Sequence, residues 1–179
     1  LEFRADTHID STRIDSRAKL NLNKADFQNL GITDAPLNLA FNMNIQAESN
    51  LLETHSINIQ GNDFKLETND RTFTPAALNL EASTSPESSF LNIATGDLKI
   101  DAALSAGYKK MQKALEEIAA MYNRQLTSKQ SIYYVQDFER LLPESNINVE
   151  CGQKNILSNY LLFNGIRFNN FILNCNLNS

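Results

Sequence analysis

The chain has 179 residues, of which 42% are hydrophobic, and a formal net charge of −5. A chain of this length and composition can bury a core, whereas its negative charge and its lack of a basic run argue against a nucleic-acid partner. The sequence has no apolar run long enough to predict a membrane span and shows no signal peptide.

The N-terminal residues 1–23 alternate between apolar and polar side chains, which is typical of strands. Apolar residues occupy odd positions up to Ile9 and even positions from Ile14 onward, so we expect a turn or bulge near 10–13. Residues 24–30 predict one helical turn that ends at Gly31. Because the alternation is already present at Leu1, we interpret the sequence as a segment of a longer protein.

The clearest strand covers residues 37–47 and follows a turn at Pro36. Its apolar residues share one face, and uncharged polar residues, mainly asparagine, occupy most of the other. This apolar face is the candidate site, either as a lipid-facing groove or as ordinary core. Its residues are Leu37, Leu39, Phe41, Met43 and Ile45.

The next segments predict further short strands at 55–60, 63–68, 76–83, 90–95 and 97–103. We expect a hairpin turn at Gly61-Asn62, another turn at 69–71 and a polar loop at 83–89. Apolar-Asn-apolar triplets recur in these strands, and the chain contains 23 asparagines. The asparagine face is interpreted as a solvated sheet surface. A glycan-binding β-sandwich is the alternative, although the chain has no tryptophan to stack on a sugar.

Residues 104–122 predict the one long helix, and a second helix at 128–142, with Thr127 and Gln130 in capping-box spacing, completes a helical hairpin. We expect the apolar stripe of the first helix to cover the apolar face of the sheet. Membrane-surface binding is the alternative for this stripe, because lysines flank it. The stripe consists of Leu104, Tyr108, Met111, Leu115, Ile118 and Tyr122.

The C-terminal part predicts a strand at 147–151, a short helix at 154–163 and a last strand at 166–177. The total is roughly nine to eleven strands, and the short connections predict antiparallel pairing. The expected fold is therefore α+β and mainly β: one module over residues 1–179, with an elongated, curved antiparallel sheet and a helical insertion at about 104–142 packed on its apolar face.

No motif of an enzyme, a metal site or a cofactor site is present in the sequence. The paired Glu116 and Glu117 are neighbours on a helix and cannot face one substrate together, so no catalytic residue is predicted. Cys151 and Cys175 are interpreted as small buried side chains, with a disulfide possible if their strands are neighbours. The two histidines, at positions 8 and 55, are interpreted as surface side chains.

Two stretches resemble internal segments of TamB-like proteins, which belong to the AsmA-like superfamily of envelope proteins, as found in Bacteroidetes. In the first stretch, a strand and a short turn lead into a long alternating strand: NLNKADFQNLGITDAPLNLAFNMNI. In the second, a strand, a short helix and a Gly-Ile-Arg-Phe step lead into a final strand: LPESNINVECGQKNILSNYLLFNGIRFNNFILNCNLNS. The helical stretch between them is compatible with the same family.

The resemblance implies the periplasmic portion of a protein anchored in the inner membrane, with a taco-shaped β-sheet and an apolar inner groove. It implies phospholipid transport, or outer-membrane protein assembly with an Omp85-type barrel partner. Phospholipid acyl chains and the rest of the parent chain are then the expected partners. If the helices fill the groove instead, the module is a structural or interaction element that pairs with neighbouring segments by strand addition.

Overall fold

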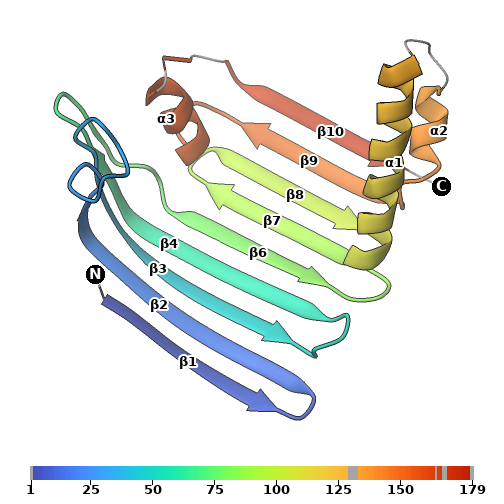
Figure 1. The fold of residues 1–179 in the computed structure, drawn as a ribbon, viewed down its shortest axis with the longest axis horizontal. Helices are drawn as coiled ribbons and strands as arrows, with labels where there is room; N and C mark the ends of the chain where they lie inside the picture. The colour runs from blue at the N-terminus through green and yellow to red at the C-terminus, as the bar shows by residue number, and fades with distance from the viewer. Residues whose placement is uncertain (1, 129–132, 164, 167–168, 178–179) are drawn as a thin grey trace.

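The computed structural model describes residues 2–128, 133–163, 165–166 and 169–177. These residues form ten strands and three helices (Figure 1). The strands are β1 (Glu2–Asp10), β2 (Arg13–Asp26), β3 (Asn38–Ser49), β4 (His55–Glu67), β5 (Thr72–Phe73), β6 (Leu78–Thr84), β7 (Ser89–Thr95), β8 (Leu98–Leu104), β9 (Ser145–Cys151) and β10 (Phe171–Leu177), and the helices are α1 (Tyr108–Ser128), α2 (Val135–Glu139) and α3 (Ile156–Phe163).

All ten strands belong to one antiparallel sheet, in the order β1-β2-β3-β4-β6-β7-β8-β9-β10, and the two-residue β5 pairs with β4 beside this path. Successive strands of the path therefore follow one another in the sequence, with β5 inserted between β4 and β6, α1 and α2 between β8 and β9, and α3 between β9 and β10 (Figure 1). The predictions of a mainly β chain, of antiparallel pairing and of the number of strands are confirmed.

The register of the sheet gathers most of the apolar residues of the strands on one side, which we call the apolar face. Its central row crosses all nine strands of the path without a polar residue, because each apolar position is paired with an apolar position on the next strand. At about 4.8 Å between strands, this row is about 38 Å long. It consists of Ala5, Ala18, Ile45, Ile59, Leu80, Ile93, Ile100, Val149 and Leu173.

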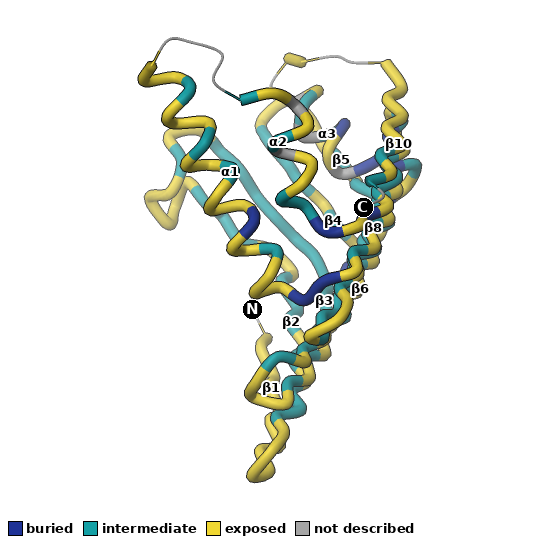
Figure 2. Tube along the Cα trace, turned by 90° about the vertical axis from the view of Figure 1, so that its right-hand side faces the viewer, coloured by how far each residue is buried: buried dark blue, intermediate teal, exposed yellow. Residues whose placement is uncertain are grey.

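The structure has little closed core. Its accessible surface is 12369 Å², whereas a compact monomer of 20.1 kDa exposes about 8,700 Å². Among the described residues, the buried hydrophobic side chains are Leu98, Ala106, Ala114 and Cys151. Figure 2 accordingly shows short buried segments between long half-buried and exposed ones. Most of the apolar face is therefore covered on only one side, by the sheet itself.

The predicted turn near 10–13 is confirmed, because Asp10 pairs with Arg13 and closes the β1–β2 hairpin. The predicted helical turn exists as one hydrogen-bonded turn that begins later than expected, after Asp26. Leu30 N–H donates to the Asp26 carbonyl at 3.1 Å, and Gly31 ends the turn with φ 70°. The turn at 69–71 is also confirmed, since the N–H of residue 68 donates to the carbonyl of residue 71 at 2.8 Å.

The predicted hairpin at Gly61-Asn62 is wrong, because β4 runs without a turn through both residues. Gly61 is instead a buried position that pairs with Met43 on one side and Leu78 on the other. The ring of Phe64 occupies the space above it, and a Cβ at this position would lie 2.6 Å from the ring. The glycine thus serves close side-chain packing inside a strand.

The predicted long helix begins and ends later than expected. Leu104 is the last residue of β8, and α1 begins at Tyr108, after the buried Gly107. A Cβ on Gly107 would lie 2.2 Å from the Ser85 carbonyl oxygen, so the glycine lets the chain turn out of the sheet there. Thr127 was expected to cap a second helix, but its Oγ1 donates to the carbonyl of Asn123 inside α1 at 2.7 Å.

The second helix is shorter than predicted. In the described residues it is α2, which has five residues and whose first turn is capped by Asp137, since Tyr134 N–H donates to Asp137 Oδ2 at 2.8 Å. The other expected capping residue, Gln130, lies outside the described residues. The short helix before the last strand is confirmed as α3.

Candidate functional site

The candidate site residues of β3 lie where they were predicted. Leu39, Phe41, Met43 and Ile45 share one side of β3, as part of the apolar face, and Leu37 lies immediately before the strand. All five are half-buried. Asparagines occupy the opposite side of the same strands, so the two faces of the sheet differ in polarity as predicted.

Two β-bulges flank this part of β3. On one side the register with β2 shifts between Leu22 and Ala25, and on the other side the register with β4 shifts between Ala40 and Asn42 of β3. The second bulge contains Asp63 at φ 54° and places Phe64 beside Phe41, with ring centroids 6.0 Å apart. Because a bulge increases local twist and bends its strand, the sheet changes direction at this end of the apolar face.

An open apolar groove of about 740 Å³ lies between α1 and the sheet. Ile57 and Ala82 form its wall on the sheet, while Met111, Leu115 and Ala119 form its wall on α1. Figure 2 shows α1 close to the sheet at its N-terminal end and directed away from it toward its C-terminal end. The groove is thus a wedge whose narrow end lies at the first turn of α1.

Polar side chains close the narrow end of this wedge. Thr84 Oγ1 accepts a hydrogen bond from the N–H of Tyr108 at 3.0 Å and bonds to Ser89 Oγ at 2.7 Å, and Ser89 Oγ in turn bonds to the carbonyl of Ala106 at 2.8 Å. The His55 ring lies 5.5 Å from that of Tyr108. These residues satisfy backbone groups at the start of α1 and fix that end of the helix on the sheet.

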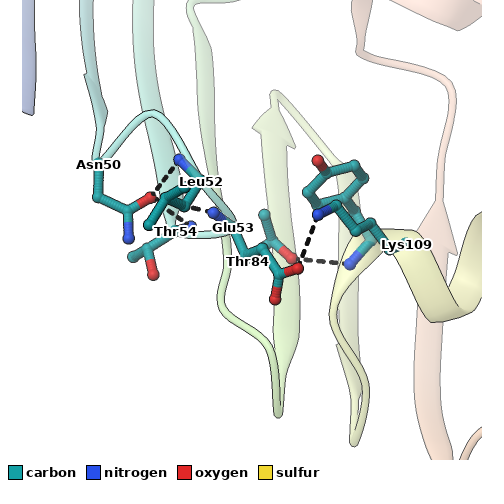
Figure 3. A network of polar contacts seen from close by, with 7 residues as sticks. Asn50, Leu52, Glu53, Thr54, Thr84 and Lys109 are labelled. Carbon is teal, nitrogen blue, oxygen red and sulfur yellow. Dashed lines mark hydrogen bonds and ion pairs between the residues drawn. The ribbon is translucent and has the colours of Figure 1, made fainter.

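The β3–β4 turn provides a second attachment for α1 (Figure 3). Asn50 Oδ1 accepts three backbone hydrogen bonds at 2.9–3.1 Å, from residues 52, 53 and 54, and thereby orders the turn. Glu53 then reaches Lys109 Nζ at 2.7 Å. The hydrogen bond to Glu53 raises the pKa of Lys109, although partial desolvation opposes this effect.

The predicted stripe follows one side of α1, and its N-terminal part lies in the groove while its C-terminal part lies beyond it. Leu104 of β8 and three residues of α1, Tyr108, Met111 and Leu115, line the groove, whereas Ile118 is half-buried outside its lining and Tyr122 is 56% exposed. The buried residue of the helix is Ala114, which the stripe did not include.

The side chains of His55, Thr84 and Ser89, which fix the start of α1 on the sheet and which we call the clamp, were not predicted from the sequence. The interpretation of His55 as a surface side chain is wrong. His55 is half-buried and its Nδ1 lies 2.8 Å from Ser49 Oγ. The alternation of the strands could have indicated this position, because four polar residues fall in phase with the apolar positions and so lie on the apolar face. They are Ser49, His55, Thr84 and Ser89.

A second polar cluster joins the β7–β8 turn to α3. Asp97 accepts hydrogen bonds from the Lys154 N–H, at 2.9 Å to each carboxylate oxygen, and from Asn155 Nδ2 at 2.7 Å. Asn155 is fully buried and caps α3, since its Oδ1 accepts from the N–H of Ser158 at 2.8 Å. Desolvation alone would raise the pKa of Asp97, but these hydrogen bonds together lower it. The cluster is a helix cap that holds α3 against the turn.

The two cysteines are free and lie on neighbouring strands, but not opposite each other. Cys151 pairs with Phe171, and Cys175 pairs with Ile147. Cys151 is buried, which agrees with its interpretation as a small buried side chain, whereas Cys175 is only half-buried. Within the described residues, no group of three or more His, Cys, Asp or Glu side chains could hold a metal ion.

Comparison of the chain with protein-family models, with curated proteins and with solved structures found no match. None of the helices in the described part of the chain has the length and apolarity needed to cross a membrane. The apolar face and its groove are therefore interpreted below from their own geometry and chemistry.

Proposed function

We propose that this chain is a periplasmic segment of a TamB-like envelope protein and that its apolar face carries phospholipid acyl chains between the inner and outer membranes. The observation that supports this proposal is the central apolar row, which crosses nine strands and whose residues are half-buried or exposed in the part of the chain that the structure describes. A soluble monomer rarely leaves a continuous apolar surface of this size open, unless another molecule binds there.

The chemistry of the apolar face suits acyl chains. Aliphatic side chains dominate the central row, and a fully buried methylene group contributes about 0.8 kcal/mol. An acyl chain on an open face is covered on one side, so each methylene contributes about half of that value. Binding of this kind is weak for each contact and unspecific along the row, which allows a lipid to move across the strands.

In this proposal the sheet curves into a taco-like trough, and α1 covers one part of it. The groove of about 740 Å³ beside α1 lies within the roughly 300–1,000 Å³ typical of small-molecule pockets. A chain enclosed there contacts apolar side chains on two sides, those of Ile57 and Ala82 and those of Met111 and Leu115. We infer that this groove retains a lipid longer than the open part of the face does.

The proposal is tested by mass spectrometry of lipids extracted from protein purified without detergent. We expect stoichiometric phospholipid from the wild-type protein and its loss from an Ile59→Glu, Ile93→Glu double variant, since both side chains lie in the central row. The matched control is Gln60→Glu, which adds the same charge on the opposite face one residue away. A folded double variant that retains its lipid would overturn the proposal.

The second candidate is a structural or interaction module in an outer-membrane assembly pathway, which pairs with neighbouring segments or with an Omp85-type barrel. The observation that favours it is the presence of exposed residues along both edge strands, β1 and β10. It predicts that well-folded protein yields no lipid in the same extraction, because the apolar face then serves only as packing surface.

A further inference from the structure

A polar recess of about 470 Å³ adjoins the apolar groove beside α1. It lies among inner strands of the sheet, where the start of β2, the end of β3 and the start of β4 come together. His55 and Ser56, at the start of β4, line both the recess and the groove, so the two cavities share a boundary there. The rest of the recess is lined by Thr12, Arg13, Glu48, Ser49, Asn50 and Thr54.

The recess and the groove have opposite chemistry. Hydroxyl, amide and charged side chains line the recess, whereas aliphatic side chains form both walls of the groove. The His55 ring connects the two, since its Nδ1 lies 2.8 Å from Ser49 Oγ in the recess and its centroid lies 5.5 Å from that of Tyr108 in the groove. Because polar groups lose free energy in apolar surroundings and apolar groups gain it, such a pair of cavities suits an amphipathic molecule.

The charged side chains of the recess are one cation and one anion. Arg13 Nη2 bonds to Glu48 Oε2, and the two side chains remain 58% and 49% exposed. The nearby carboxylate of Glu53 is paired with Lys109 at 2.7 Å (Figure 3). The guanidinium and the carboxylate of the recess therefore balance each other, which suits a ligand that carries both charges better than one that carries a net negative charge.

We propose that the recess binds the phosphoethanolamine headgroup of a zwitterionic phospholipid while an acyl chain of the same molecule lies in the groove. This inference rests on the proposed function, because it assigns a headgroup to the lipid carried there. The half-exposed ion pair opens to admit the headgroup. The Arg13 guanidinium then donates to the phosphate, and the primary ammonium, which has three N–H donors, donates to the Glu48 carboxylate.

A glycerol headgroup makes only half of these contacts. Its phosphate binds Arg13, but it has no cation for Glu48, whose carboxylate is then left beside an anionic lipid. An ion pair between half-exposed partners changes an affinity by up to about fivefold. We therefore expect a preference of about threefold to fivefold for the ethanolamine lipid over the glycerol lipid.

Headgroup choice is measured with vesicles that contain equal amounts of phosphatidylethanolamine and phosphatidylglycerol with identical acyl chains. The protein is incubated with these vesicles and separated from them, and its bound lipid is then extracted and quantified by mass spectrometry. The ratio of the two bound lipids reports the recess, whereas their total amount reports the apolar groove and face.

Two variants are expected to shift this ratio in opposite directions. Glu48→Gln removes the partner of the ammonium and leaves an unpaired cation, so the ratio of ethanolamine to glycerol lipid falls to about one or below. Arg13→Gln leaves Glu48 to attract the ammonium and to repel the anionic lipid, so the ratio rises. The matched control Glu67→Gln removes a carboxylate from the Lys65–Glu67 ion pair at the other end of β4 and leaves the ratio unchanged.

The outcomes separate this inference from the proposed function. Wild-type protein that binds the two lipids in equal amounts, or variants that shift the ratio in the same direction, would overturn the headgroup assignment and leave the proposed function intact. A folded wild-type protein that acquires no lipid from the vesicles would overturn both. Opposite shifts in the two variants, with an unchanged control, support the assignment, because a general loss of structure would move both ratios alike.

Discussion

Ile59→Glu measures whether the apolar face is open or is the inside of a closed core. Ile59 lies in the central row, on the inner strand β4, between Ile45 of β3 and Leu80 of β6. Its side chain is half-buried. Complete burial of such a side chain contributes about 1.5–3 kcal/mol to folding, so a half-buried one contributes about 1–1.5 kcal/mol.

The introduced carboxylate remains in contact with water if the face is open, so it adds no large desolvation cost. Replacement of a β-branched residue in a central strand adds up to about 1 kcal/mol. The expected loss in the free energy of unfolding is therefore about 1–2.5 kcal/mol. In a closed core, a charge without a partner would cost more than about 4 kcal/mol.

Urea unfolding followed by far-UV circular dichroism provides the measurement. With a slope of about 2 kcal/mol per M, the expected loss lowers the midpoint by about 0.5–1.2 M. The control Gln60→Glu changes the same strand on its exposed face and is expected to shift the free energy of unfolding by less than about 0.5 kcal/mol. An Ile59→Glu protein that fails to fold while the control folds normally would refute the open face.

Three further predictions concern the turns that position the helices. Gly96→Ala should reduce the free energy of unfolding by about 2 kcal/mol or more and so lower the melting temperature, because the new Cβ would lie 1.7 Å from the Lys154 carbonyl oxygen at a φ of 59°. A melting temperature equal to that of the wild type would contradict this contact. Because the pKa of Asp97 is lowered in the folded protein, its carboxylate stabilises the fold at pH values above its unfolded pKa, and this contribution disappears as the pH falls through the folded pKa. Asp97→Asn should therefore make the free energy of unfolding less dependent on pH in the acid range. An unchanged pH dependence would contradict this role of Asp97. Thr84→Val removes the acceptor for the Tyr108 N–H and should cost about 1 kcal/mol while hydrogen exchange in the first turn of α1 accelerates; unchanged exchange would exclude the capping role.

The strands could be predicted from the sequence where one face is apolar and the other polar. The alternation in β3 placed Leu39, Phe41, Met43 and Ile45 on one side, and the structure confirms that side as part of the apolar face. The prediction was wrong at Gly61, because a glycine followed by asparagine favours a hairpin turn locally. In the folded sheet this glycine instead leaves room for the ring of Phe64 within β4.

The helical insertion was predicted less accurately, because its boundaries depend on contacts that are distant in the sequence. Gly107 and the cap provided by Thr84 start α1 four residues after the end of β8. The clamp could not be predicted from residues taken singly, since Ser89 and His55 become neighbours of the helix only through the register of the sheet. The central row is likewise a property of the register of nine strands.

The large accessible surface of the fold has a calorimetric consequence. Relative to a fully extended chain, the structure removes about a fifth less surface from water than a compact monomer of the same mass. Since the heat-capacity change of unfolding follows the surface that unfolding exposes, this change should be smaller than for a compact protein of the same length. The curve of stability against temperature is then flatter, so a modest maximum stability extends over a wider range of temperatures.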